Sequence, residues 1–135
     1  RRWEIARSSF EEGRVGYLQW RTELARFHAA ESAKILTALG YDPETIERVK
    51  KINAKQGLRS DPEVQSMEDA LCLSFLEHDL EAFAAKRPDD KIVEILQKTW
   101  KKMSPRGRES ARELSASLPV RARELVMRAL SSGAG

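Results

Sequence analysis

The sequence predicts an all-α fold of about six helices. Apolar residues recur at spacings of three and four through most of the chain, which is typical of amphipathic helices. No segment alternates apolar and polar residues as a half-buried strand would, and no Asn-Gly or Asp-Gly pair marks a hairpin. Glycines and prolines separate the helical patterns. With 135 residues, the chain fits one helical domain, residues 1–135.

The first segment is aromatic and polar, without clean periodicity. We expect residues 1–5 to be the end of a helix and residues 6–13 to be a loop. Three apolar side chains are expected to anchor this segment to the core: Trp3, Ile5 and Phe10.

A long helix is predicted over residues 14–39, before Gly40, a residue common just past helix C-termini. One stripe of this helix carries Tyr17, Trp20, Leu24, Phe27, Ile35 and Ala38. Arg21, His28 and Glu31 lie on or beside the same stripe. These polar residues are informative, because a purely solvated face would place them opposite the apolar side chains.

The next helix is predicted over residues 43–55. Asp42 is a sound N-cap and Pro43 fits the first helical position. Gly57 ends the pattern. Its inward residues are Ile46, Val49 and Asn53, with Lys50 beside them.

A central helix, roughly residues 61–86, follows the cap formed by Ser60, Asp61 and Pro62. It carries two apolar stripes, one with Val64, Met67, Leu71, Phe75 and Ala82, the other with Cys72, Leu73, Leu76, Leu80 and Phe83. A helix that is apolar on most of its circumference is normally buried, so we expect the domain to be built around this one. His78 shares the side of Leu71 and is expected in the core or a pocket.

Three further helices are predicted, over residues 90–103, residues 105–116 and from Pro119 onward. Inward positions of the first and last are Ile92, Ile95, Leu96, Thr99, Met103, Leu125, Val126, Ala129 and Leu130. From Lys98 to the end there are nine Lys or Arg residues and three Glu residues. This basic tail could bind a polyanion, but packing across the acidic central helix is the favoured interpretation, and we do not expect nucleic acid as a partner.

Cys72 is the only cysteine, which excludes an internal disulfide and suits a reducing, cytoplasmic compartment. No apolar run approaches the roughly 18 residues that a membrane span needs, and no signal peptide is visible. The chain starts at Arg1 without a methionine, inside what looks like folded sequence. We therefore expect the C-terminal part of a longer protein.

Two adjacent carboxylates stand inside the apolar pattern of the central helix. Glu68 and Asp69 each precede apolar residues by one turn. A carboxylate in apolar surroundings must be paired, metal-bound or protonated. Glu68 and Asp69 are therefore either a base and a ligand for Mg²⁺ or Mn²⁺, or members of salt bridges with Arg21, Lys50 or Arg59. For His28, a metal ligand or general base competes with the favoured interpretation, a core histidine paired with Glu31 or Arg21.

The full chain resembles an uncharacterised helical family, domain of unknown function 4202. The family segments RRWEI, GRxGYLxWRxxLxxFHA, LEDAxCLxFLEH and KTWKKMS are matched by Arg1–Ile5, Gly13–Ala29, Met67–His78 and Lys98–Ser104. The block from Phe27 to Asp79 also resembles the second half of an HD-type metal-dependent phosphohydrolase domain.

The HD resemblance implies an HD-like fold that acts on a small phosphorylated, nucleotide-like substrate. His28 and Asp69 would hold a divalent ion (Mn, Mg, Fe or Zn) and Glu68 would be the catalytic base. The predicted substrate-binding residues are Arg21, Lys50 and Arg59. The chain lacks the His-Asp doublet of that family, and Asn53, Lys55 and Gln56 stand where another histidine is common. The alternative is therefore a catalytically degenerate module that binds a ligand or a protein.

Overall fold

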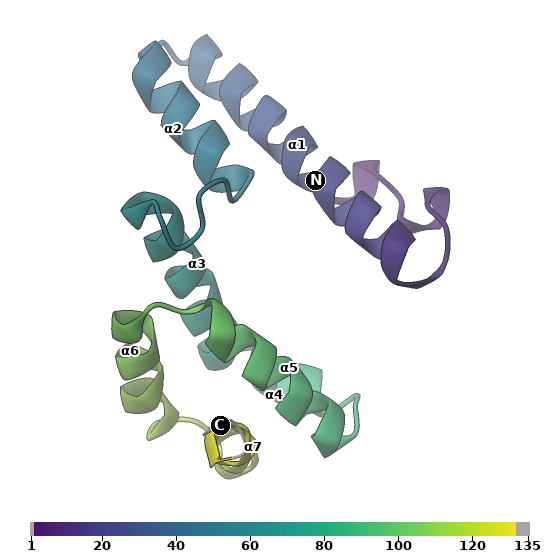
Figure 1. Ribbon diagram of the computed structural model, residues 1–135, viewed down its shortest axis with the longest axis vertical. Helices are drawn as coiled ribbons and strands as arrows, with labels where there is room; N and C mark the ends of the chain where they lie inside the picture. The colour runs from purple at the N-terminus through teal and green to yellow at the C-terminus, as the bar shows by residue number, and fades with distance from the viewer. Residues whose placement is uncertain (1, 132–135) are drawn as a thin grey trace. The chain divides into compact units, whose positions relative to one another are not determined.

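A computed structural model of the chain describes residues 2–131 (Figure 1). All regular secondary structure in that range is helical, which confirms the predicted all-α class. The chain divides into two compact units, one reaching Val64 and the other beginning at Gln65. That the two units together form a single HD-like domain stays a prediction. Between residues 2 and 131, no helix combines the length and the apolar character needed to cross a bilayer.

The first unit starts with two 3₁₀ turns, η1 (Arg2–Glu4) and η2 (Arg7–Ser9). The predicted helix end over residues 1–5 is therefore wrong for the described residues, and Arg1 lies outside them. Trp3 is exposed, so it does not anchor the segment as predicted. The anchor is instead a backbone group, since the Ile5 carbonyl accepts a hydrogen bond from Trp20 Nε1 at 2.8 Å.

Helix α1 (Gly13–Ala38) agrees with the predicted range of 14–39. Its first turns lie directly against the preceding segment: a Cβ at Gly16 would be 1.9 Å from the Glu11 carbonyl oxygen. Only glycine permits this approach. The 3₁₀ segment is thus held on α1 by close backbone packing as well as by the Trp20 hydrogen bond.

The turn from α1 to α2 (Pro43–Asn53) is fixed by local backbone chemistry. Gly40 has a φ of 78°, and its N–H donates to the Thr37 carbonyl while that of Tyr41 donates to the Leu36 carbonyl. This pair of bonds is the Schellman arrangement that ends helices. Asp42 then caps α2 by accepting from the Thr45 N–H at 2.9 Å, which holds the pKa of Asp42 below its usual value.

Helices α1 and α2 form an antiparallel hairpin, seen side by side in Figure 1. Asn53, at the end of α2, donates a hydrogen bond to Ser32 Oγ on α1 at 2.8 Å. No residue of α2 is fully buried. Its half-buried residues include Ile46, Val49 and Ile52, so partly exposed apolar side chains accompany this hydrogen bond.

The predicted central helix is one continuous helical run made of α3 (Pro62–Ser74), a π-helical turn η3 (Phe75–Asp79) and α4 (Leu80–Ala84). Its length agrees with the predicted 61–86, but of the first predicted stripe only Val64 is fully buried. Cys72, Leu76 and Leu80 lie in the core. Met67 and Leu71 are exposed, so the expected burial around most of the helix is wrong.

The π-helical turn explains which residues of this run are buried. The buried positions are spaced by four: Glu68, Cys72, Leu76, Leu80 and Ala84. In an α-helix of 3.6 residues per turn, such a series drifts by about 40° at each step. A π turn takes up an extra residue and offsets part of this drift. His78, predicted to be in the core or a pocket, lies within η3 with an exposed side chain that contacts Glu77 at 3.3 Å.

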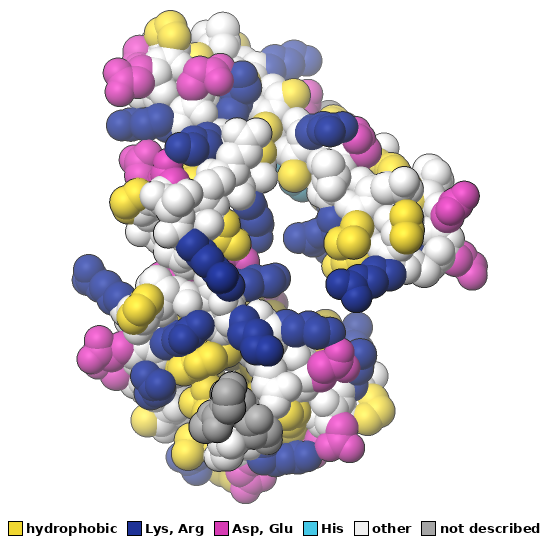
Figure 2. Space-filling model, in the orientation of Figure 1, with side chains coloured by type: hydrophobic (Ala, Val, Ile, Leu, Met, Phe, Trp, Pro, Cys, Tyr) yellow, Lys and Arg dark blue, Asp and Glu magenta, His cyan; other side chains and the backbone are white. Residues whose placement is uncertain are grey.

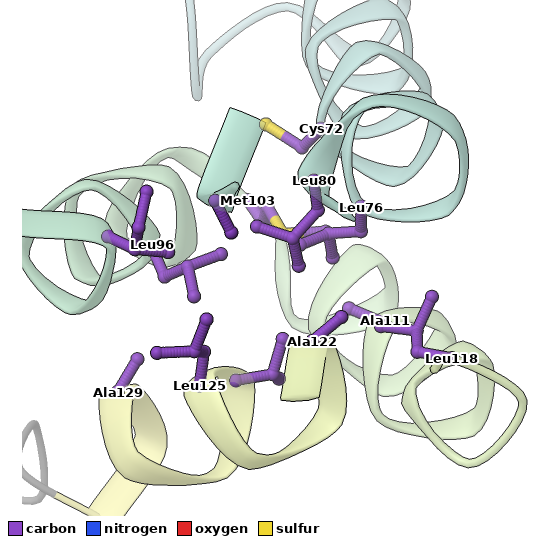
Figure 3. Packing of buried hydrophobic residues seen from close by; sticks show 13 residues of the cluster. Cys72, Leu76, Leu80, Leu96, Met103, Ala111, Leu118, Ala122, Leu125 and Ala129 are labelled. Atoms are coloured by element: carbon purple, nitrogen blue, oxygen red, sulfur yellow. The ribbon is translucent and has the colours of Figure 1, made fainter. Parts of the chain in front are cut away.

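The rest of the second unit consists of α5 (Asp89–Lys102), α6 (Pro105–Ser115) and α7 (Val120–Ser131). These bounds agree with the three predicted helices. The core that they form with η3 and α4 is largely aliphatic, and Figure 3 shows its side chains pointing toward one another. It contains Cys72, Leu76, Leu80, Ala84, Ile92, Leu96, Met103, Ala111, Leu118, Ala122, Leu125, Val126 and Ala129.

Ion pairs tie the basic tail to α5. Arg121 donates to Asp89 at 2.8 Å and Arg128 to Asp90 at 2.9 Å. The Arg121 bond holds the pKa of Asp89 below its usual value. The tail was predicted to pack across the central helix, and its apolar residues do share a core with that helix, while the carboxylate partners of Arg121 and Arg128 lie on the first turn of α5.

Candidate functional site

The six predicted site residues are divided between the two units. Arg21, His28, Lys50 and Arg59 belong to the first unit, and Glu68 and Asp69 to the second. Arg21 and Arg59 are exposed, while Lys50 is half-buried. His28 is also half-buried, and its ring centre is 5.8 Å from that of Phe27.

Asp69 joins α3 to the start of α6. Its Oδ1 accepts hydrogen bonds from the Ser104 N–H at 2.8 Å and from Gln65 Nε2 at 2.9 Å. Its Oδ2 accepts from the Ser104 hydroxyl. Ser104 is the N-cap of α6 and accepts in turn from the Gly107 N–H at 3.0 Å. This carboxylate therefore fixes the residue that caps α6.

The α6 backbone also fills the space beside the Asp69 carboxylate. A Cβ at Gly107 would lie 2.5 Å from the Asp69 carboxyl carbon. A carboxylate has about four lone-pair sites, and three of those on Asp69 already accept hydrogen bonds. This packing favours a structural role for Asp69.

Glu68 is the most deeply buried charged residue among those predicted for the site, with 4% of its surface exposed. Lys102 Nζ lies 3.9 Å from its Oε1. The predicted salt-bridge partners were Arg21, Lys50 or Arg59, whereas Lys102 belongs to the basic tail that was expected to pack across this helix. A buried carboxylate with a nearby cation fits the ion-pair alternative for this residue.

Metal ligation at His28 and Asp69 stays a prediction. Across residues 2–131, no three His, Cys, Asp or Glu side chains converge where they could hold an ion. The test of Asp69 as a ligand is given in the Discussion.

A hollow of about 570 Å³ lies between α1 and α2. Its lining is rich in cations and in small side chains. The residues that line it are Arg26, Ala29, Ala30, Glu44, Glu47, Arg48, Lys50, Lys51, Ala54 and Gln56. Lys50 is the one predicted substrate-binding residue among them. Figure 2 shows dark-blue and magenta side chains gathered over α2.

The hollow exists because the facing side chains are short. Ala29 and Ala30 on α1 and Ala54 after α2 contribute only a methyl group each. Long cationic side chains stand around these methyl groups. Polar and charged residues outnumber these alanines in the lining, so the hollow is more polar than most small-molecule sites.

Each of the four cations around the hollow is near a carboxylate. Arg26 bonds Glu23 at 2.7 Å, Lys50 bonds Glu47 at 2.6 Å, Lys51 bonds Asp61, and Arg48 is 3.9 Å from Glu63. The Lys51 bond holds the pKa of Asp61 below its usual value. All these pairs are partly exposed.

Exposed ion pairs of this kind contribute only about 0–1 kcal/mol each to stability. Their carboxylates hold the four cationic side chains in place at little energetic gain. A dianionic phosphate can therefore replace a carboxylate partner at little cost. The hollow is thus suited to an anion.

A protein-family model matches residues 1–126 of this chain. The chain belongs to the family described as Domain of unknown function (DUF4202). Searches of curated proteins and of solved structures gave no match. The match confirms the predicted membership, while the HD resemblance stays a prediction.

Two of the segments that carry the DUF4202 resemblance meet in the structure. The Asp69–Ser104 hydrogen bonds join the segment Met67–His78 to the segment Lys98–Ser104. A third segment, Gly13–Ala29, ends at the floor of the hollow. In this DUF4202 chain the matched segments thus include both a structural junction and part of the candidate site.

Arg26, Arg48 and Lys51 were missed as site residues. The run Arg48-Val49-Lys50-Lys51 signals a basic end of α2, and the adjacent Ala29 and Ala30 signal a gap on α1. The two signals are 18 residues apart in the chain, counted from Ala30 to Arg48, and the hairpin brings them together.

Proposed function

We propose that this chain binds a small phosphorylated molecule in the hollow between α1 and α2. The observation that carries the proposal is the set of four cations, Arg26, Arg48, Lys50 and Lys51, around an alanine floor. Arginine guanidinium groups match phosphate oxygens in a two-pronged geometry, and lysines add point charges.

The size of the hollow supports a small ligand. Pockets for small molecules span roughly 300–1,000 Å³, and this one is about 570 Å³. Two carboxylates, Glu44 and Glu47, also line it, and Glu23, Asp61 and Glu63 pair with three of its cations from outside. This balance of charges favours the exchange of one carboxylate for one phosphate group over the binding of a long polyanion.

The proposal is tested by titration calorimetry of the whole chain with adenosine monophosphate and with inorganic phosphate. We expect heat of binding for both, with affinity falling as salt rises because the contacts are partly exposed. The double variant Arg48→Ala, Lys51→Ala should weaken binding by about tenfold or more, as expected for lost hydrogen bonds between charged groups.

The matched control is the double variant Lys91→Ala, Lys98→Ala. Both lysines bond Glu94 on α5, so this variant removes the same charge from the second unit. Ala30→Leu should also weaken binding of the nucleotide, because the larger side chain fills part of the hollow without a change of charge. Equal losses in the two double variants, or no binding by the wild type at millimolar ligand, would overturn the proposal.

The predicted metal-dependent hydrolysis extends this proposal and can be followed in the same samples. Release of inorganic phosphate with added Mn²⁺ would favour the phosphohydrolase. Binding without product on long incubation would favour the catalytically degenerate module.

A further inference from the structure

The charges around the hollow are not mixed evenly along α2. Glu44 stands in the first turn of this helix, while Lys50 and Lys51 stand in the last. Glu44 and Lys51 are seven residues apart, which is about 10 Å along a helix axis. The hollow therefore has an acidic end and a basic end.

The position of Arg26 strengthens the basic end. The antiparallel hairpin places Ser32 of α1 beside Asn53, at the end of α2. Arg26 lies about two turns before Ser32 on α1, in the direction that continues past the end of α2. Arg26 thus lines the hollow on the side of Lys51 rather than of Glu44.

Glu44 and Glu47 determine what the acidic end can accept. Ionised carboxylates accept hydrogen bonds and cannot donate them. Glu47 uses Oε1 for Lys50, which leaves Oε2 for another donor. A ligand amino group is therefore favoured at this end, whereas a ligand carbonyl oxygen or a second phosphate is repelled.

From this polarity we infer that the ligand is a phosphate monoester that also carries a hydrogen-bond-donating amino group. This inference rests on the proposed function and specifies its ligand class. The phosphate binds at the basic end formed by Arg26, Arg48 and Lys51. The amino group binds Glu44, about 10 Å from Lys51 along α2, with Glu47 one turn nearer the phosphate. The body of the ligand spans the distance between the two ends.

Adenosine and inosine monophosphates provide a matched pair of probes. They share the phosphate, the ribose and the bicyclic ring. Where adenine has an amino group beside a bare ring nitrogen, hypoxanthine has a carbonyl oxygen beside a ring N–H, so only adenine presents a donor at the exocyclic position. We expect the adenine nucleotide to bind about tenfold more tightly, the effect of one hydrogen bond to a charged group. The measurement is calorimetry with both nucleotides and with inorganic phosphate.

Glu44→Gln, Glu47→Gln is the variant that tests the assignment. The amide of glutamine has an oxygen that accepts and an NH2 group that donates, so it can bond to either nucleotide. The preference for adenosine monophosphate over inosine monophosphate should therefore shrink to about twofold or less. The control is the double variant Glu109→Gln, Glu113→Gln on α6. It removes the same charge and should keep the preference for adenosine monophosphate.

The possible outcomes distinguish the proposed phosphate binding from the inferred ligand class. Equal affinity of wild type for the two nucleotides, or a preference that persists in the Glu44, Glu47 variant, overturns the ligand class and leaves phosphate binding standing. Absence of binding by either nucleotide and by inorganic phosphate overturns both. Circular dichroism of each variant checks that the helical content is unchanged.

Discussion

The two units of this chain use their helices in opposite ways. In the second unit, α4, α5 and α7 enclose aliphatic side chains, and Leu80 and Ile92 have no exposed surface. In the first, the α1–α2 hairpin fully buries no residue of α2, and alanines and cationic side chains line the hollow between its helices. Buried apolar area is the main source of folding stability. The contrast indicates that the second unit provides most of the stability, while the first provides the candidate binding surface.

The largest effect on stability is expected from a cavity in the core of the second unit. Leu80→Ala should lower the free energy of unfolding by about 3 kcal/mol, because a fully buried leucine leaves a cavity when truncated. Leu39→Ala is the matched change in the first unit, where the leucine is 69% exposed, and should cost less than about 1 kcal/mol. Urea denaturation followed by circular dichroism measures both. Similar losses would show that the two units do not differ as described.

A smaller effect is expected at the junction of α3 and α6. Asp69→Ala removes the acceptor that holds Ser104, and we expect a loss of about 2 kcal/mol of stability. Asp69→Asn, which keeps one acceptor oxygen, should lose less.

The same preparations test Asp69 as a metal ligand. If Asp69 binds a metal, protein purified without chelator should contain about one equivalent by elemental analysis, and Asp69→Ala should lose it. A purely structural role predicts the same metal content in wild type and variant.

The smallest expected effect is a pH dependence on the surface of α5. Bonds from Lys91 and Lys98 lower the pKa of Glu94 from its ordinary value of 4.5 to about 2. Because the folded pKa lies below the unfolded one, the contribution of Glu94 is present above about pH 4.5 and is lost as the pH falls toward 2. Glu94→Gln should reduce the decline of the melting temperature across this range. Since the group is exposed, salt should also diminish the difference, and a variant with an unchanged pH profile would contradict this account.

The helices were predictable because their ends carry local signals. Asp42-Pro43 and Ser104-Pro105 begin α2 and α6 where their cap hydrogen bonds are observed. The inward faces of α5 and α7 also followed from a spacing of 3.6 residues per turn. In the central helix the periodicity placed His78 on the side of Leu71, but both residues are exposed, because that side of the helix is not covered as we expected.

The candidate site was less predictable because it depends on packing between distant residues. Asp69 was recognised as a carboxylate that needs a partner, but the partner, Ser104, is 35 residues away. Lys50 was identified, whereas its neighbours around the hollow required the pairing of α1 with α2. A sequence pattern identifies a polar residue on an apolar face more readily than it identifies the residues opposite.

The π-helical turn also has a consequence for how this chain can tolerate changes in length. The turn accommodates one residue more than a regular α-helix would, so Cys72 and Leu80, eight residues apart in the chain, face the same core. Deleting one residue within 75–79 should therefore be tolerated, because seven residues of regular α-helix also bring the two side chains to within about 20° of each other. Adding one residue there should turn them apart by about 100°, and it would carry Asp69 away from Ser104 if Leu80 kept its place. This short stretch therefore sets the angular alignment between the aliphatic core and the carboxylate that caps α6.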